Sequence, residues 1–112
     1  MIEQVHPAAL TDWFARDPAA QHLLLDVREP WEVQTAHVQP TGYTVLAIPM
    51  HEIPSRLEEL DPAARIACLC HHGARSQNVA AFLADRGYQT IANVAGGIDA
   101  WSLHHDGNVA RY

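Results

Sequence analysis

The chain has 112 residues, of which 48% are hydrophobic and 7% aromatic, and its formal net charge at pH 7 is −6. This length accommodates one domain, and the hydrophobic content excludes a disordered polypeptide. The negative charge disfavours nucleic acid and anionic membranes as partners. All seven basic residues are arginine, so catalysis by lysine is excluded.

The two cysteines, Cys68 and Cys70, are separated by one residue. Two such positions on one face of a strand are poorly placed for a mutual disulfide. Residues 1–7 lack the basic and apolar regions of a signal peptide, and no apolar run reaches the length of a membrane span. We therefore expect a cytoplasmic protein whose thiols stay reduced.

The first half of the chain alternates between strand and helix patterns. Residues 2–5 are predicted as a strand, and a helix that begins at Pro7 carries Leu10, Trp13 and Phe14 as its apolar stripe. The second strand, residues 23–27, is almost continuously apolar, which is typical of a strand buried on both faces of a parallel sheet.

A short helix is predicted to begin at Pro30, followed by a loop over residues 37–43 and a third strand over residues 44–48. Apolar residues then recur at helical spacing over residues 53–60, which predicts another helix. Pro54 fits only the first turn of such a helix.

The fourth strand is predicted over residues 65–69 and leads into Cys70. Ser76 is the expected N-cap of a helix over residues 77–86, and Gly87 its C-cap. The fifth strand, residues 90–94, precedes a Gly-Gly turn and a final helix.

This alternation predicts a single α/β domain, with a five-stranded parallel sheet flanked by helices on both faces. The domain is expected to cover residues 1–112, with its core over residues 3–104 and a loose tail over residues 105–112. No repeat or linker interrupts it.

The most informative segment is the passage from the fourth strand into the following helix. An apolar run ends at Cys70, a short turn follows, and a helical pattern begins at once. A thiol at a helix N-terminus lies near partial positive charge and unpaired backbone N–H groups, which favour the nucleophilic thiolate. Cys70 is therefore the predicted nucleophile, whereas Cys68, in the middle of the strand, is predicted to fill the core.

Four segments, in order along the chain, resemble the single-domain rhodaneses, a family of sulfurtransferases. They are residues 25–32 (LDVREPWE), 36–38 (AHV), 70–76 (CHHGARS) and 93–101 (NVAGGIDAW). The chain departs from the family pattern after His37, where residues 39–43 (QPTGY) replace a short Pro-Gly-Ala turn in the entrance loop.

The resemblance implies that Cys70 carries a sulfane sulfur as a persulfide between a small-molecule donor such as thiosulfate and a thiophilic acceptor such as cyanide or a thiol. A protein donor or acceptor is also compatible with this chemistry. No cofactor and no metal are implied. The expected cradle for the persulfide consists of the loop residues His71, His72, Gly73, Ala74, Arg75 and Ser76, with backbone N–H groups of residues 71–75 pointing inward.

Three residues outside the loop are predicted to support it. Asp26 and Arg28 follow the second strand, at the edge where parallel sheets place their sites, and Trp101 is expected to line the pocket. Two roles remain open for Arg75. Its guanidinium either binds an anionic donor or pairs with Glu29 or Glu32 and fixes the loop.

Two other functions, and a metal site, fit the sequence less well than sulfur transfer does. Cysteine phosphatases use a Cys-x5-Arg loop, whereas residues 70–75 form the shorter Cys-x4-Arg, which suits one sulfur atom better than a phosphate. A non-catalytic binding module is disfavoured by the presence of Cys70. A metal site built from the paired histidines His71, His72, His104 and His105 lacks the usual ligand spacing.

Overall fold

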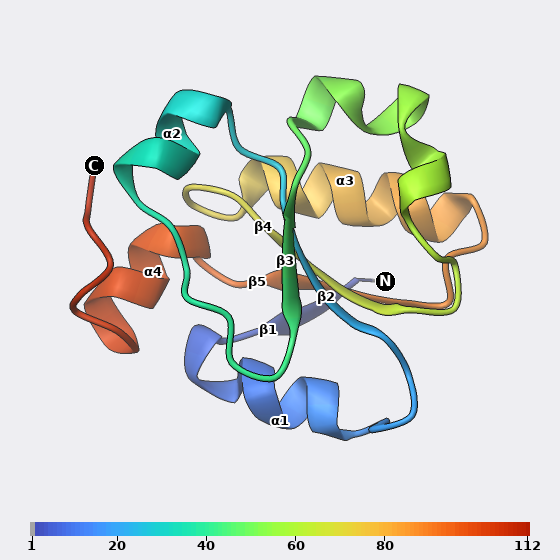
Figure 1. The fold of residues 1–112 in the computed structure, drawn as a ribbon, viewed down its shortest axis with the longest axis horizontal. Coiled ribbons are helices and arrows are strands. Elements are labelled where there is room, and N and C mark those ends of the chain that lie inside the picture. Colours follow the sequence, from blue (N-terminus) through green and yellow to red (C-terminus); the bar gives the residue numbers. More distant parts are fainter. Residues whose placement is uncertain (1) are drawn as a thin grey trace.

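The computed structural model of the protein describes residues 2–112. Its centre is a five-stranded sheet in the order β1-β5-β4-β2-β3, in which every neighbouring pair is parallel (Figure 1). The strands are β1 (Glu3–Val5), β2 (His22–Asp26), β3 (Thr44–Ala47), β4 (Arg65–Leu69) and β5 (Thr90–Val94). The predicted parallel sheet is confirmed, and β4 lies at its middle.

Helices cover both faces of the sheet, as predicted. They are α1 (Leu10–Ala15), α2 (Pro30–Thr35), α3 (Ala74–Asp85) and α4 (Gly97–His104), and a 3-10 turn, η1 (Pro7–Ala9), precedes α1. One core cluster joins α1 and α4 to the sheet through residues such as Phe14 and Ile98. A second cluster on the other face contains Val79 and Leu83 of α3 together with Cys70.

The predicted helix over residues 53–60 is wrong in type. Two 3-10 segments, η2 (Met50–Ser55) and η3 (Leu57–Glu59), occupy this part of the chain. Pro54 lies inside η2 and has no N–H to donate, so it cannot continue an α-helical hydrogen-bond pattern. Ile53 and Leu60 are still buried, so the apolar spacing identified the core-facing side correctly.

The start of α3 also differs from the prediction. The helix begins at Ala74, its N-cap is Gly73, and Ser76 lies within its first turn. Gly73 has a φ of +105°, a left-handed conformation that glycine adopts without strain. This turn carries the chain into the helix earlier than expected and buries Ser76 completely.

The expectation of a loose tail over residues 105–112 is wrong, because the tail packs on the domain. The N–H of Asp106 donates to the carbonyl of Trp101 (2.8 Å), which ends α4 and redirects the chain. Val109 is buried, and its carbonyl accepts a hydrogen bond from Ser102 Oγ (2.6 Å). The chain then reaches the neighbourhood of α2, where Figure 1 marks the C end.

Within residues 2–112, the helices are all too short or too polar to cross a membrane.

Candidate active site

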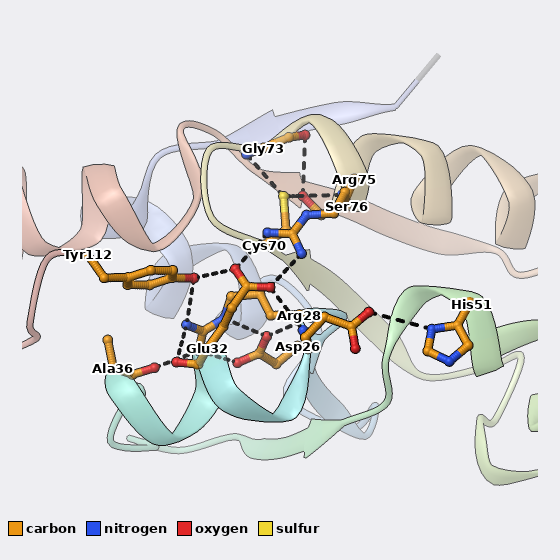
Figure 2. A network of polar contacts seen from close by, with 11 residues as sticks. Asp26, Arg28, Glu32, Ala36, His51, Cys70, Gly73, Arg75, Ser76 and Tyr112 are labelled. Atoms are coloured by element: carbon orange, nitrogen blue, oxygen red, sulfur yellow. Dashed lines mark hydrogen bonds and ion pairs between the residues drawn. The ribbon is translucent and has the colours of Figure 1, made fainter.

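Cys70 follows the central strand β4 and is almost fully buried, with 1% exposure. Its Sγ accepts hydrogen bonds from the backbone N–H of Gly73 (3.1 Å), the backbone N–H of Ser76 (3.3 Å) and Ser76 Oγ (3.2 Å) (Figure 2). These donors belong to the turn and the first residues of α3, as expected for a thiol at a helix N-terminus. Together they stabilise negative charge on the sulfur.

The backbone of the loop offers further donors. Of the N–H groups of residues 71–75, which were predicted to point inward, only that of Gly73 binds Sγ. Those of His71, His72, Ala74 and Arg75 donate to no acceptor within residues 2–112. The loop and the first turn of α3 therefore contain backbone donors without a protein acceptor.

The N-terminus of α4 fixes the loop from outside. The N–H of Ile98 donates to the carbonyl of Cys70 (2.8 Å), and that of Asp99 donates to the carbonyl of His71 (3.1 Å). Gly97 makes this approach feasible, because a Cβ there would lie 2.4 Å from the Cys70 oxygen and 2.5 Å from the His71 oxygen. The Gly-Gly pair before α4 is therefore part of the site's construction.

Asn93 on β5 is a site residue whose role was not predicted from the sequence. Its side chain is buried, its Nδ2 donates to the carbonyl of Gly73 (3.1 Å), and its Oδ1 is a second acceptor for Ser76 Oγ, whose single proton is shared between this oxygen and Cys70 Sγ. Asn93 thereby fixes both the turn and the hydroxyl that contacts Cys70. An amide in an otherwise apolar buried strand, beside the strand that carries the cysteine, was the signal that could have identified it.

Asp26 and Arg28 form a buried ion pair with an Nη2–Oδ2 distance of 2.7 Å. Arg28 also donates to the carbonyls of Glu32 (3.1 Å) and Ala36 (2.7 Å), which ties the end of β2 to α2. Burial lowers the pKa of Arg28, but the hydrogen bond and charge of Asp26 outweigh it and raise the pKa above its usual value. This geometry fits the predicted supporting role.

Arg75 pairs with Glu32, one of the two carboxylates that the sequence left open. Its Nη1 and Nη2 lie 2.7 Å and 2.8 Å from the two carboxylate oxygens, which is a bidentate arrangement. Glu32 is 3% exposed, and its pKa is lowered to about 2. The hydrogen bond from Arg75 is the largest cause and outweighs burial, which acts in the opposite direction.

Tyr112 joins this network from the tail, and sequence reasoning missed it. Its hydroxyl donates to Glu32 Oε2 (2.7 Å) and accepts from Arg28 Nη1 (3.1 Å), as Figure 2 shows. Burial, the largest cause, raises the pKa of this hydroxyl to about 12. The aromatic ring stacks on that of His71 at 3.9 Å with an interplanar angle of 13°.

The two loop histidines differ in environment. His71 lies between the rings of Tyr112 and His72, and the second stacking distance is 4.0 Å. Burial, followed by the charge of His72, lowers the pKa of His71. His72 is exposed, as expected for a surface residue of the loop.

Trp101 does not occupy the predicted position in the pocket. It belongs to the core cluster of α1 and α4, whereas Cys70 belongs to the cluster on the other face. The sequence also predicts Trp31 as a core aromatic, and this prediction is wrong, because the side chain is 61% exposed. Trp101 therefore supports the site only through α4, whose N-terminus holds the loop.

Cys68 is fully buried in β4, and burial raises the pKa of its thiol to about 12. It fills the core, as predicted, and its thiol is not poised to react. No three histidine, cysteine, aspartate or glutamate side chains gather in a metal-binding arrangement in the part of the chain that the structure describes.

The sheet is parallel, and Cys70 lies at its carboxyl edge inside a backbone loop at the start of a helix. These features together define the class of domain. The family model for the rhodanese-like domain matches residues 7–104. The chain belongs to the rhodanese-like domain family, and the fold predicted from the sequence is thereby confirmed.

Similar proteins agree with this assignment. A sulfurtransferase from Allochromatium vinosum is 37% identical over 82 residues, which cover 73% of each chain. The putative sulfurtransferase YtwF from Bacillus subtilis is 34% identical over 100 residues, covering 89% of this chain and 90% of that one. The crystal structure of a rhodanese-like domain protein from Staphylococcus aureus has the same fold, with a TM-score of 0.75, 23% identity and 99% coverage of both chains.

Proposed function

We propose that the protein is a sulfurtransferase that carries a sulfane sulfur as a persulfide on Cys70. The observation that carries this proposal is the position of Sγ, which accepts three hydrogen bonds from Gly73 and Ser76 inside a loop with further backbone N–H donors. The family and the names of its relatives support the transfer of sulfur in general.

The reaction has two half-reactions. The Cys70 thiolate attacks the sulfane sulfur of the donor, the donor's S–S bond breaks, and the remainder leaves with the bonding electron pair, as sulfite does from thiosulfate. The product is Cys70–S–S⁻. The acceptor, cyanide in an assay or a thiol in the cell, then attacks the outer sulfur and releases the Cys70 thiolate.

The loop stabilises the negatively charged intermediate. The backbone N–H groups of residues 71, 72, 74 and 75 have no acceptor within residues 2–112, so they are the natural donors to the outer sulfur. The four-residue spacing between Cys70 and Arg75 suits a single sulfur atom rather than a phosphate. Both half-reactions exchange sulfur between nucleophiles, so the mechanism needs no cofactor.

The partners follow from the chemistry. One is a small molecule or a protein that donates sulfane sulfur, and the other is a thiophilic acceptor. Cys70 must return to the reduced state after each cycle, and we therefore place the reaction in the cytoplasm, where thiols stay reduced.

Intact-mass spectrometry tests the proposal. Incubation with a sulfane donor should add the mass of one sulfur atom to the wild type, and cyanide should remove it. Thiosulfate, 3-mercaptopyruvate and an organic persulfide would be tried in parallel. Cys70→Ser should gain nothing, whereas Cys68→Ala is the matched control that keeps Cys70 and should still be loaded.

The competing function is a binding module that uses the same fold without turnover. It predicts no persulfide with any of the three donors and no difference between wild type and Cys70→Ser. That outcome would contradict sulfur transfer and make a search for protein partners the next step.

A further inference from the structure

Both terminal nitrogens of Arg75 donate to the carboxylate of Glu32, so the positive charge of Arg75 is paired. We propose that Glu32, held in place by Tyr112, is a specificity-determining residue that keeps Arg75 from anionic donors. The site would then favour persulfides of thiols, whose transferable end carries at most one negative charge, over the thiosulfate dianion. This inference rests on the proposed sulfurtransferase function.

Glu32 is held rigidly. Besides the two bonds from Arg75, its carboxylate accepts hydrogen bonds from the backbone N–H of Glu29 (3.0 Å) and from the Tyr112 hydroxyl (2.7 Å). The carboxylate is buried, and the bond to Glu29 is one half of a capping box at the start of α2. A carboxylate with four donors in fixed positions does not release its arginine readily.

Tyr112 closes this arrangement from the opposite side (Figure 2). Its hydroxyl lies between Arg28 and Glu32, so it receives one hydrogen bond and gives one. Its ring lies flat on His71 of the loop. The tail thus connects the carboxylate that holds Arg75 to the backbone turn that surrounds Cys70.

The other charged side chains around the loop are also paired, so they do not replace the positive charge of Arg75. The pairs Asp26–Arg28 and Glu32–Arg75 are each neutral. The carboxylate of Asp99, at the start of α4, is paired with Arg111 (3.1 Å). Among residues 2–112, a small dianion that enters this region therefore meets backbone N–H groups and arginines that are already paired with carboxylates, so it must give up its hydration without a free counter-charge.

A persulfide donor avoids that cost. The Cys70 thiolate attacks the outer sulfur of R–S–SH, the S–S bond breaks, and R–S⁻ leaves with the electron pair, giving Cys70–S–SH. The proton of this product can pass to the departing thiolate. Only the outer sulfur needs to enter the loop, so the donor's own group R remains outside the Glu32–Arg75 pair.

The test compares the second-order rate constants for loading Cys70 from thiosulfate and from the persulfide of 2-mercaptoethanol. Wild type should prefer the persulfide. Glu32→Gln keeps one oxygen, which can still accept from the Glu29 N–H, but it replaces the oxygen that Tyr112 contacts with an amide donor and loses the charge that holds Arg75. We expect it to raise the rate constant for thiosulfate about tenfold relative to the persulfide, equivalent to about 1.4 kcal/mol, mainly through a lower KM.

Three further variants make the interpretation specific. Glu29→Gln removes the same charge from the N-cap of α2 without touching Arg75, and it should leave the donor ratio within about twofold. Adding Arg75→Ala to Glu32→Gln should abolish the gain, because the liberated guanidinium is its cause. Tyr112→Phe keeps the ring on His71 and loses the hydroxyl, and it should shift the ratio in the same direction by a smaller factor. If Glu32→Gln fails to fold, the donor ratio of Tyr112→Phe tests the proposal in its place.

The possible failures are distinguishable. A wild type that accepts sulfur from neither donor would refute the proposed function and this inference with it. A wild type that is loaded, but whose donor ratio stays unchanged in Glu32→Gln and Tyr112→Phe, would refute the inference alone. An equal gain in Glu29→Gln would also refute it, since a general change in charge would then suffice.

Discussion

Asn93 Nδ2 donates a 3.1 Å hydrogen bond to the carbonyl of Gly73, which joins the strand β5 to the turn that surrounds Cys70. Asn93→Ala removes this bond and the acceptor for Ser76 Oγ. Leaving these buried groups unpaired should lower the free energy of unfolding by about 1–3 kcal/mol. Thermal or chemical unfolding would measure the loss, and the rate of Cys70 loading should fall as well.

Asn93→Asp tests whether the bond to Gly73 contributes to Cys70 loading or only to stability. It keeps an oxygen for Ser76 but replaces the donor to Gly73 with a second oxygen, which is repelled by the carbonyl. We expect slower loading than in wild type even at temperatures where the variant is fully folded. Loading at the wild-type rate would show that the bond to Gly73 contributes only to stability.

Gly97→Ala should disrupt the loop around Cys70 by more than the backbone strain of replacing a glycine at positive φ. The added Cβ would lie 2.4 Å from the carbonyl oxygen of Cys70, and the backbone φ is +63°. Gly42→Ala is the matched control, since its φ is +77° but nothing lies within 4 Å of the added atom. Both variants bear the left-handed strain of about 1–2 kcal/mol. Only Gly97→Ala should lose Cys70 loading, which mass spectrometry would follow.

Ser76→Ala removes the hydroxyl that donates to Cys70 Sγ at 3.2 Å. A hydrogen bond to a charged group contributes about 1.5–3 kcal/mol, so we expect loading to slow by about tenfold to a hundredfold. Ser55→Ala, whose hydroxyl donates to the carbonyl of Glu52 in an exposed turn, serves as the control. Equal rates for Ser76→Ala and wild type would exclude the hydroxyl from stabilising the reacting sulfur.

The Glu32–Arg75 pair predicts a specific dependence of stability on pH. The pKa of Glu32 is lowered to about 2 in the folded protein, below its unfolded value, so the carboxylate's contribution is complete above about pH 4.5 and is lost as the pH falls towards 2. The difference between wild type and Glu32→Gln should therefore shrink by up to about 3 kcal/mol over this range. Urea unfolding between pH 6 and pH 2 would measure it, and a constant difference would contradict the ion pair.

The sequence was sufficient for most of the fold because buried strands leave a strong signal. The apolar runs around Leu24 and Ala67, each bounded by turn residues, placed β2 and β4 to within one residue at either end. The helix type over residues 53–60 was missed because apolar spacing identifies the buried side and not the hydrogen-bond pattern. There, Pro54 decided the outcome.

Of the candidate site, the position of the nucleophile Cys70 could be predicted from the sequence, but several of its contacts could not. Cys70 could be located because a strand, a turn and a helix meet at one cysteine. Ser76 was expected to cap a helix because its side chain has that chemistry, yet Gly73 takes the position and the hydroxyl faces the sulfur. Tyr112 could not be predicted, because the path of the tail depends on tertiary contacts such as the burial of Val109 and not on any local period.

The order of the sheet has a consequence for how the protein would fail when heated. The strand β4 has partners on both sides, β2 and β5, whereas β1 and β3 are short and lie at the edges. Fraying begins at edges and termini, so the segment that carries Cys70 should be among the last to exchange its amide hydrogens. Its capacity to hold sulfur should therefore decline together with global unfolding, and residual loading after heating should serve as a direct count of molecules that remain folded.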